Sequence, residues 1–536
     1  MRDVNLSRRR FLTLAGGATA MAAGSGLLAA CGTTAAPSTG GAGSVTFPDY
    51  IPYQLVKPDL AATPEGVMAG YYKYPRDLVN AFSTKPGEGA GDVSILTNMF
   101  NPVPPGADSN AYWQELNSRV GANLNITMTP AADYLGKLST VIAGGDLPDM
   151  MLISAKLSHR ADVLTRLCAD LSEHLSGSAV GKYPSLANIP TDSWLSTAYN
   201  GGIYAVPIPR AIIGTIMFSR ADLIAERGLD PAPADYTAFL ALAQGMTDER
   251  ANRWAFGSPK GVITFIGNML NVPNVWREEG GKFTSEHETP ERKEAVARTA
   301  EMVAAGLFHP DSMGGKLQLR DLFGNGTLGF NADGYAAWDI LADTYKVDVG
   351  GLVTPGYSGG AGANRAGTPA FALTAFKKAD KSRIEQMLRI CDWLAAPIGT
   401  SEYMFRKFGI EGTHYNWDGD APVLTDQGGV EVKLPLEYVI DSPHVLGPRG
   451  EKRVDTQRAY QEKVVPTILR NPSEGLYSAT AVDKAGELAK IIDSAELDIV
   501  SGRKPISAWD EAVTAWRNAG GDQSRKELEE AFAAQK

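Results

Sequence analysis

The sequence contains little cysteine and, beyond its first 30 residues, no long apolar run. Its three cysteines among 536 residues are Cys31, Cys168 and Cys391. Three thiols are too few for a disulfide framework or for a zinc site built from cysteines alone. The longest apolar run of the body, residues 211–218, falls well short of the roughly 20 residues that a membrane-spanning helix needs. We therefore expect neither a disulfide scaffold nor an integral membrane protein.

Positive charge is also scarce. The chain has 51 lysines and arginines against 61 aspartates and glutamates, a net charge of −10. Nucleic-acid binding is disfavoured, because attraction to phosphates needs clustered cations. The remaining composition, 44% hydrophobic and 21% charged, is ordinary for a soluble globular protein, and the length allows two to four domains.

Sequence motifs of enzymes are few. Residues 356–360 match the G-x-S-x-G pattern, but they lie among other glycines with no helix starting after them, so we expect a loop and not a nucleophile elbow. The six histidines form no H-E-x-x-H motif, and neither a P-loop nor a dinucleotide-binding motif follows a strand. A pair of catalytic carboxylates for glycoside hydrolysis stays open, since their separation is a property of the structure.

The first 30 residues form an export signal. Residues 8–12 read Arg-Arg-Arg-Phe-Leu, which resembles a twin-arginine signal, and a weakly hydrophobic stretch follows. Residues 28–31, Leu-Ala-Ala-Cys, resemble a bacterial lipobox, in which Cys31 is acylated and becomes the mature N-terminus. We expect a protein outside the cytoplasm, held by lipid on the outer face of the cell membrane. The alternative is an uncleaved membrane anchor or a buried N-terminal helix.

Removal of this leader changes the charge and exposes a tether. Residues 1–30 contain four arginines and one aspartate, so the mature chain of 506 residues has a net charge of −13. Residues 31–44 are Gly, Ser, Thr, Ala and Pro after the cysteine, a composition typical of a flexible linker with a reach of roughly 20 Å.

The two other cysteines lie on apolar helical stripes. Cys168 shares a face with Leu164 and Leu171, and Cys391 shares one with Leu388 and Leu394. We expect buried free thiols; a single disulfide between them is the alternative. Trp509, Val513 and Trp516 likewise predict an amphipathic helix packed on a core.

Strand-like and helical patterns alternate along the body, which predicts an α/β fold. Strands are expected at residues 93–96, 123–128, 150–153, 202–207 and 212–218. Helices are expected near residues 113–120 and 134–143.

Six segments in a fixed order carry a family resemblance. They are AADYLGKLSTVIAGGDLPDMML (131–152), NGGIYAVPIPR (200–210), IMFSRADLIAERGL (216–229), DLFGNGTLGFNADGYAAWD (321–339), KFGIEGTHYNW (407–417) and IVSGRKPISAWDEAVTAWRNAG (499–520). This order resembles the solute-binding lipoproteins of bacterial carbohydrate ABC importers, and more distantly the maltose-binding protein. Residues 408–412 resemble the longer-chain subgroup that includes alginate-oligosaccharide-binding proteins.

The resemblance covers residues 91–530 and implies a two-lobed periplasmic-binding-protein fold of type II, with a hinge and a ligand between the lobes. It implies a first lobe of residues 45–209 and 365–410, and a second of residues 211–354 and 411–536. The implied partners are a small carbohydrate and the transmembrane subunits of an ABC permease, with no cofactor and a monomeric state. Some long-chain relatives bind calcium, but residues 246–253 lack alternating oxygen ligands, so no metal site is expected.

Sugar sites combine aromatic rings with polar side chains, which selects the candidate ligand-binding residues. The richest cluster follows an expected strand at residues 327–330 and contains Asp333, Tyr335 and Trp338, where the resemblance implies a stacking ring; core packing is the alternative for Trp338. The other candidates are Asn98, Phe100, Arg210, Trp276, Glu411 and Trp417. Arg210 could instead bind a core carboxylate, and Trp276 could belong to the core.

The sequence therefore predicts a non-catalytic binding lipoprotein that delivers a sugar to a permease. The alternative is an exported, lipid-anchored glycoside hydrolase; a peptide ligand, or an envelope adaptor without a small ligand, also stays open. The acidic net charge favours a neutral over a uronic ligand.

Overall fold

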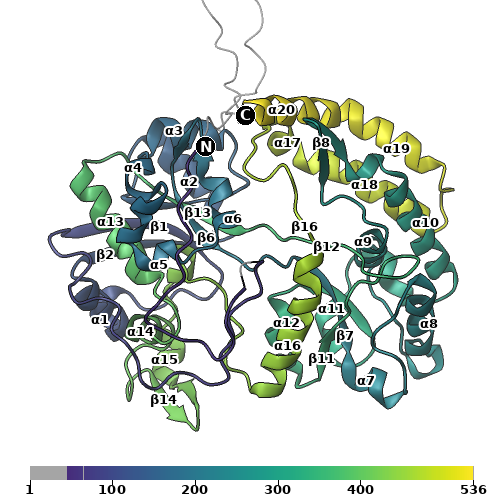
Figure 1. Cartoon of the computed structure of the whole chain (residues 1–536), viewed down its shortest axis with the longest axis horizontal. Helices are drawn as coiled ribbons and strands as arrows, with labels where there is room; N and C mark the ends of the chain where they lie inside the picture. The colour runs from purple at the N-terminus through teal and green to yellow at the C-terminus, as the bar shows by residue number, and fades with distance from the viewer. Residues whose placement is uncertain (1–44, 64, 535–536) are drawn as a thin grey trace, which may run out of the picture. The chain divides into compact units, whose positions relative to one another are not determined.

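A computed structural model describes residues 45–63 and 65–534 of the chain (Figure 1). The export signal, Cys31 and the tether lie outside the described residues. The α/β class is as the sequence predicts, with two separate sheets that each carry their own hydrophobic clusters. We call these two parts the first and the second lobe.

The first lobe is built on a five-stranded mixed sheet with the order β2-β1-β3-β13-β6. β1 pairs in parallel with β2 and β3, whereas β13 runs antiparallel to β3 and β6. The strands are β1 (Asp92–Met99), β2 (Asn123–Pro130), β3 (Met150–Ile153), β6 (Val206–Pro209) and β13 (Ala370–Phe376). Two short hairpins flank this sheet, β4 (Ala198–Tyr199) with β5 (Gly202–Ile203), and β14 (Tyr415–Asp418) with β15 (Ala421–Leu424).

Alternate residues of these strands face two different clusters. Val93 and Ile95 pack in one cluster, and Leu96 packs in the other, because successive strand side chains point to opposite faces. Helices cover both faces: α1 (Ala111–Val120), α2 (Tyr134–Gly144), α3 (Arg160–Leu167), α4 (Ser172–Leu175), α5 (Pro184–Ala187), α6 (Thr191–Trp194), α13 (Lys381–Leu394), α14 (Ser401–Phe408) and α15 (Asp426–Glu431). Local signals set their ends; Asn110 caps α1 through the Trp113 amide, and left-handed Gly121 ends it.

The second lobe has a three-stranded antiparallel sheet with the order β10-β7-β11. Its strands are β7 (Thr215–Arg220), β10 (Phe330–Gly334) and β11 (Val349–Gly351), beside a hairpin of β8 (Trp276–Glu279) and β9 (Lys282–Ser285). Its helices are α7 (Ala221–Glu226), α8 (Tyr236–Met246), α9 (Pro259–Met269), α10 (Pro290–Ala304), α11 (Leu319–Gly324), α12 (Ala337–Tyr345), α16 (Glu451–Val464), α17 (Ala479–Asp483), α18 (Ala485–Val500), α19 (Ala508–Trp516) and α20 (Asp522–Ala533). Figure 1 shows the yellow C-terminal helices α18 and α19 beside α10. Trp509 and Trp516 are buried there, as the sequence predicts.

Three chain segments lie side by side at the boundary between the lobes. β12 (Asn364–Arg365) pairs in parallel with β16 (Ile468–Leu469), and Ile213 bridges to Ala366 beside them. Gly214 and Gly367 approach so closely that a Cβ on Gly214 would lie 2.9 Å from the Gly367 backbone nitrogen. Only glycine fits this contact, which places the backbones of two crossing segments against each other.

The expected lobe boundaries need one correction. Residues 411–536 were expected in the second lobe, but Leu434, Leu436, Val439 and Ile440 pack in the same cluster as Val93 of β1. These apolar side chains complete the core of the first lobe. The chain therefore returns to the second lobe only with α16, which starts at Glu451, about 40 residues later than the resemblance implies.

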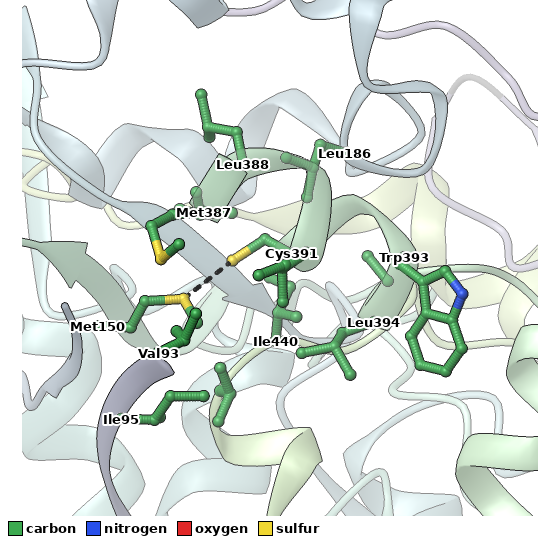
Figure 2. Packing of buried hydrophobic residues seen from close by; sticks show 14 of the residues in the cluster. Val93, Ile95, Met150, Leu186, Met387, Leu388, Cys391, Trp393, Leu394 and Ile440 are labelled. Atoms are coloured by element: carbon green, nitrogen blue, oxygen red, sulfur yellow. Dashed lines mark hydrogen bonds between the residues drawn. The ribbon is translucent and has the colours of Figure 1, made fainter. Parts of the chain in front are cut away.

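Cys168 and Cys391 are buried free thiols, as predicted, and the alternative of a disulfide between them is wrong. They belong to different clusters of the first lobe. Figure 2 shows the Cys391 sulfur pointing at the sulfur of Met150, at 3.7 Å. Burial raises the pKa of both thiols, for Cys168 to about 12, so both stay protonated and act as small hydrophobes.

Candidate ligand-binding site

One edge of the first-lobe sheet collects several of the predicted residues. β1, β3 and β6 end at this edge, and antiparallel β13 begins there. Phe100 directly follows β1, Arg210 directly follows β6, and Phe371 is the second residue of β13. The topology thus brings together residues that are far apart in the sequence, at the strand ends where α/β proteins commonly bind ligands.

Three rings form a group at this edge, which we call the aromatic triad: Phe100, Phe371 and Tyr438. The ring centroids of Phe100 lie 5.1 Å from Tyr438 and 6.3 Å from Phe371, and those of Phe371 and Tyr438 are 5.3 Å apart. The guanidinium carbon of Arg210 lies 4.7 Å from the centroid of the Phe371 ring. Phe100 is 60% exposed, which makes it a large apolar surface supported from below by two other rings.

Hydrogen bonds hold the backbone beneath these rings. The Thr97 hydroxyl on β1 donates to the carbonyl oxygen of Tyr438 at 2.8 Å, and the Thr374 hydroxyl on β13 donates to the carbonyl oxygen of Val439. The Arg210 amide donates to the carbonyl oxygen of Pro369 at 3.0 Å. The triad therefore rests on the sheet itself and is pre-organised.

Asn98 and Arg210 add polar groups beside the triad. Asn98 is buried near the end of β1, and its Oδ1 has no hydrogen-bond partner within the described part of the protein. Burial lowers the pKa of Arg210, and the nearby Tyr438 opposes that decrease. Arg210 is exposed and its guanidinium lies over the Phe371 ring, so the structure does not place it against a carboxylate of the core.

Asp333 lies in the second lobe, at the rim of a hollow of about 440 Å³ between α11, α12 and β10. Arg320 donates two hydrogen bonds to its carboxylate, at 2.7 and 3.2 Å. Asn331 also lines this hollow, and its buried Nδ2 lacks a hydrogen-bond partner within residues 45–63 and 65–534. The strand here is Phe330–Gly334 and not residues 327–330, so Asp333 is on the strand itself.

Tyr335, Trp338 and Trp276 belong to the core and not to a surface. Tyr335 donates a hydrogen bond to Gln457 and accepts one from Gln461, both on α16. Trp338 is 2% exposed and packs edge-to-face on Phe218. Trp276 packs on Phe283 and Trp516. Because these rings lie inside two hydrophobic clusters, we leave all three out of the proposed site.

Glu411 and Trp417 lie at a different place, around the β14–β15 hairpin. The Tyr415 hydroxyl donates to Glu411 at 3.5 Å, and the Arg76 guanidinium lies 3.6 Å from the Trp417 ring centroid. Figure 1 places β14 at the end of the first lobe away from β12 and β16. The structure does not bring these two residues to the aromatic triad.

Three residues at the sheet edge were not predicted from the sequence: Phe371, Tyr438 and His444. Phe371 could have been found from its place at the start of an apolar strand after a glycine-rich crossing. Tyr438 and His444 carry no local signal, because they come from the segment that was assigned to the wrong lobe. The surrounding chain lowers the pKa of His444, as do Lys407 and Arg210, while Asp441 opposes them.

The segment that matches G-x-S-x-G is a loop and not a strand-to-helix elbow. Residues 356–360 form a turn closed by the Gly356 amide and the Gly360 carbonyl oxygen, with no helix after it, as predicted. Within the described ranges, no three His, Cys, Asp or Glu side chains converge to hold a metal ion. Across residues 45–63 and 65–534, no helix combines the length and the apolar character needed to cross a bilayer.

Comparison with known proteins supplies the family. A relative, the polygalacturonan/rhamnogalacturonan-binding protein YtcQ of Bacillus subtilis, is 25% identical over 471 residues, which cover 82% of this chain and 91% of that protein. The N-glycan transport solute-binding protein NgtS of Streptococcus pneumoniae has a TM-score of 0.61 at 14% identity, over 83% of this chain and 98% of that one. For the alginate-binding protein AlgQ2 the TM-score is 0.55 at 15% identity, over 85% of this chain and the whole of that one.

These two structures show the fold, the two-lobed α/β architecture of solute-binding proteins that the sequence predicts. Residues 111–386, more than half of the chain, match the family described as bacterial extracellular solute-binding protein. The chain therefore belongs to the family of bacterial extracellular solute-binding proteins.

Proposed function

We propose that the protein captures an oligosaccharide between its lobes and delivers it to the transmembrane subunits of an ABC permease, without chemical turnover. The observation that carries this proposal is the aromatic triad at the carboxyl edge of the first-lobe sheet. Two relatives support a sugar ligand by their names, a polygalacturonan/rhamnogalacturonan-binding protein and an N-glycan transport protein.

The physical case rests on the exposure of Phe100. Because the ring is 60% exposed, much of its apolar surface is in contact with water. The C–H face of a pyranose can cover that surface. Stacking fixes one face of a sugar, and Arg210 and Asn98 offer hydrogen bonds to its rim. Asp333 and Arg320 in the second lobe are proposed to contact the ligand from the other side, with the glycine contact of the crossing segments acting as the hinge.

We expect Phe100→Ala to weaken oligosaccharide binding by about 10- to 100-fold, the loss typical of an aromatic anchor. Because the ring is largely exposed, the thermal unfolding midpoint should change little. Isothermal titration calorimetry of the mature protein against a panel of neutral and acidic oligosaccharides measures the affinity, and chromatography of the same mixtures detects any product.

Tyr50→Ala is the matched control, since Tyr50 is an aromatic residue that is 43% exposed and lies in the N-terminal segment. Its affinity should equal that of the unaltered protein. Equal binding by the Phe100 variant would remove the triad from the site. Cleavage of any oligosaccharide would instead favour the lipid-anchored glycoside hydrolase.

We further propose that the protein works as a monomer anchored through Cys31. The Arg-Arg-Arg-Phe-Leu segment and the Leu-Ala-Ala-Cys segment support export by the twin-arginine route followed by acylation. Mass spectrometry of membrane-extracted protein should find a diacylglyceryl group on an N-terminal Cys31, and Cys31→Ala should move the protein from the membrane to the soluble fraction. Export of an unmodified, uncleaved chain would contradict the anchor.

A further inference from the structure

The chain segment that precedes β1 contacts both lobes, and we call its residues 65–82 the N-terminal strap. One part of the strap is bound to α16, which packs in the cluster beneath the second-lobe sheet. The Met68 amide donates a hydrogen bond to Gln461 of α16 at 2.8 Å, and the Tyr72 hydroxyl donates one to Asp455 of α16 at 2.8 Å. The strap is therefore attached to the second lobe along the length of this helix.

The attachment to α16 continues into a buried hydrogen-bond network. Gln461 donates to the Tyr335 hydroxyl at 2.7 Å, and this hydroxyl donates to Gln457 at 3.0 Å. Gln457 in turn donates to Asp339 of α12 at 2.9 Å. Because buried polar groups are costly to leave without partners, this network holds α16 and the strap firmly on the second lobe.

The following part of the strap is bound to the first lobe. The Tyr74 ring packs edge-to-face on Phe408 of α14, with ring centroids 5.4 Å apart. The Val79 amide donates to the carbonyl oxygen of Gly399 at 3.1 Å, just before α14 begins. The strap thus passes from one lobe to the other between Tyr72 and Tyr74.

Residues 441–450 cross between the lobes beside the strap. Asp441 pairs with an arginine of α14 in the first lobe at 2.7 Å, and Arg449 pairs with an aspartate of α12 in the second lobe at 3.3 Å. Between them, Leu446 exchanges two backbone hydrogen bonds with the strap, at 2.8 and 3.0 Å. Two chain segments that are paired with each other therefore join the lobes at this place.

This connection lies far from the glycine contact of the other crossing segments. α16 begins directly after residues 441–450, and its end leads through one short turn into β16. Its 14 residues span about 21 Å at the helical rise of 1.5 Å per residue. Figure 1 shows α16 ending beside β12 and β16. The lobes are thus joined at two places that are about 20 Å apart.

We propose that the strap and residues 441–450 form a second hinge point, which limits the movement of the lobes to rotation about a line along α16. Two bodies that are joined at two separate points can rotate only about the line through both points. A single hinge point would also allow the lobes to twist. The inference goes beyond the proposed function, and only its affinity measurement rests on that function.

The test lengthens both segments without removing any of their contacts. Gly-Ser-Gly-Ser is inserted in the strap between Tyr72 and Lys73, and in the crossing segment between Gly447 and Pro448. Four flexible residues add a reach of about 10 Å, so the second hinge point should no longer restrain the lobes. The strap insertion alone should have a smaller effect in the same direction, and it provides the test if the double insertion does not fold.

Double electron–electron resonance measures the movement of the lobes without any ligand. Spin labels are attached to the mature protein carrying Cys31→Ala, through Lys137→Cys with Gln244→Cys, or through Val430→Cys with Ile340→Cys. Each pair combines an exposed position of the first lobe with one of the second, and the two buried thiols should not react. The distance distributions of the double insertion should broaden by about 5 Å or more for at least one pair.

Calorimetry with an oligosaccharide that the unaltered protein binds gives a second measurement. The double insertion should weaken binding about 3- to 10-fold, because the added freedom of the lobes must be lost when the ligand binds. The same insertion between Pro231 and Ala232, in an exposed loop of the second lobe, is the control and should change neither width nor affinity.

Distance distributions as narrow as those of the unaltered protein would overturn the second hinge point, whatever the ligand. If no oligosaccharide binds the unaltered protein, the proposed function fails, while the distance measurement still decides the hinge.

Discussion

Replacing Arg292 with alanine is expected to lower the free energy of unfolding by about 3–5 kcal/mol. Its side chain is only 6% exposed on α10 and lies between two buried carboxylates. The guanidinium is 2.5 Å from Glu496 of α18 and 3.3 Å from Glu286. Removing Arg292 leaves Glu286 and Glu496 buried without its positive charge. The cost of these buried negative charges accounts for the large effect.

The same network reaches the crossing segments. Arg365 of β12 pairs with Glu286 at 2.9 Å, so one carboxylate connects the core of the second lobe to the strand that joins the lobes. Burial would raise the pKa of Glu286, but Arg292 and Arg365 outweigh it and lower that pKa to about 2. The stability that ionised Glu286 provides is therefore present above its ordinary pKa of 4.5 and is lost only as the pH falls toward 2.

This linkage sets the sign of the pH effect in the Arg292 variant. Without Arg292, protonation of Glu286 becomes easier, so the destabilisation should be smaller at pH 5 than at pH 8. Urea unfolding followed by circular dichroism measures both values. Arg298→Ala on the same helix is the control: Arg298 pairs with Glu294 and Glu301 at the surface, where such pairs contribute about 1 kcal/mol or less. A loss below about 1 kcal/mol for Arg292→Ala would show that the network is not stabilising.

The sequence predicts the two site residues that follow strands. Phe100 was a candidate because it lies in the loop after the first expected strand, and Arg210 because it lies at an expected crossing between lobes; the sheet topology carries both to one edge. This rule works because strand direction in an α/β sheet fixes where each strand ends. The burial of Cys391, Trp509 and Trp516 was also predicted, since helical periodicity marks the side that faces a core. Cys168 is buried as expected, but α3 ends at Leu167, so the expected helical stripe does not reach it.

The same rule fails for Tyr335 and Trp338. Their local pattern resembles that of Phe100, because both follow a strand and are aromatic. They are buried by Gln457, Tyr460 and Gln461 of α16, which lie more than 100 residues later in the chain. No residue near Tyr335 in the sequence indicates that α16 covers it. Whether an aromatic residue after a strand is exposed to a ligand or buried in the core therefore depends on tertiary packing.

Tyr438 was not predicted because the sequence assigns its segment to the wrong lobe. Residues 411–440 carry apolar side chains that suit either lobe, and only packing shows that they complete the first. With them come Tyr438, which forms the triad, and Asp441, which neutralises Arg406 and Lys407. The composition of the aromatic triad therefore depends on a segment whose position the sequence did not reveal.

Asp392→Asn is expected to gain stability relative to the unaltered protein as the pH rises from 4 to 8, by up to about 4 kcal/mol. Asp392 is 2% exposed on α13, beside Cys391. Burial raises its pKa from 3.8 to about 7, although the amides of Leu186 and Ser185 donate hydrogen bonds that oppose the increase. The folded state therefore holds a proton that the unfolded state releases, and stability falls as the pH rises between these two values.

Asparagine keeps the acceptor for both amides but cannot ionise, so the pH dependence should disappear with the carboxylate. The measurement is the difference in unfolding free energy between the two proteins at several pH values, in which contributions of other groups such as His287 cancel. Asp149→Asn in the same lobe is the matched control. Arg383 and Ser94 outweigh burial and lower the pKa of Asp149 to about 2. The difference in unfolding free energy between Asp149→Asn and the unaltered protein should therefore stay constant from pH 5 to 8. A constant difference for Asp392→Asn as well would mean that Asp392 is ionised in the folded protein, and that its two amide hydrogen bonds outweigh the burial of its charge.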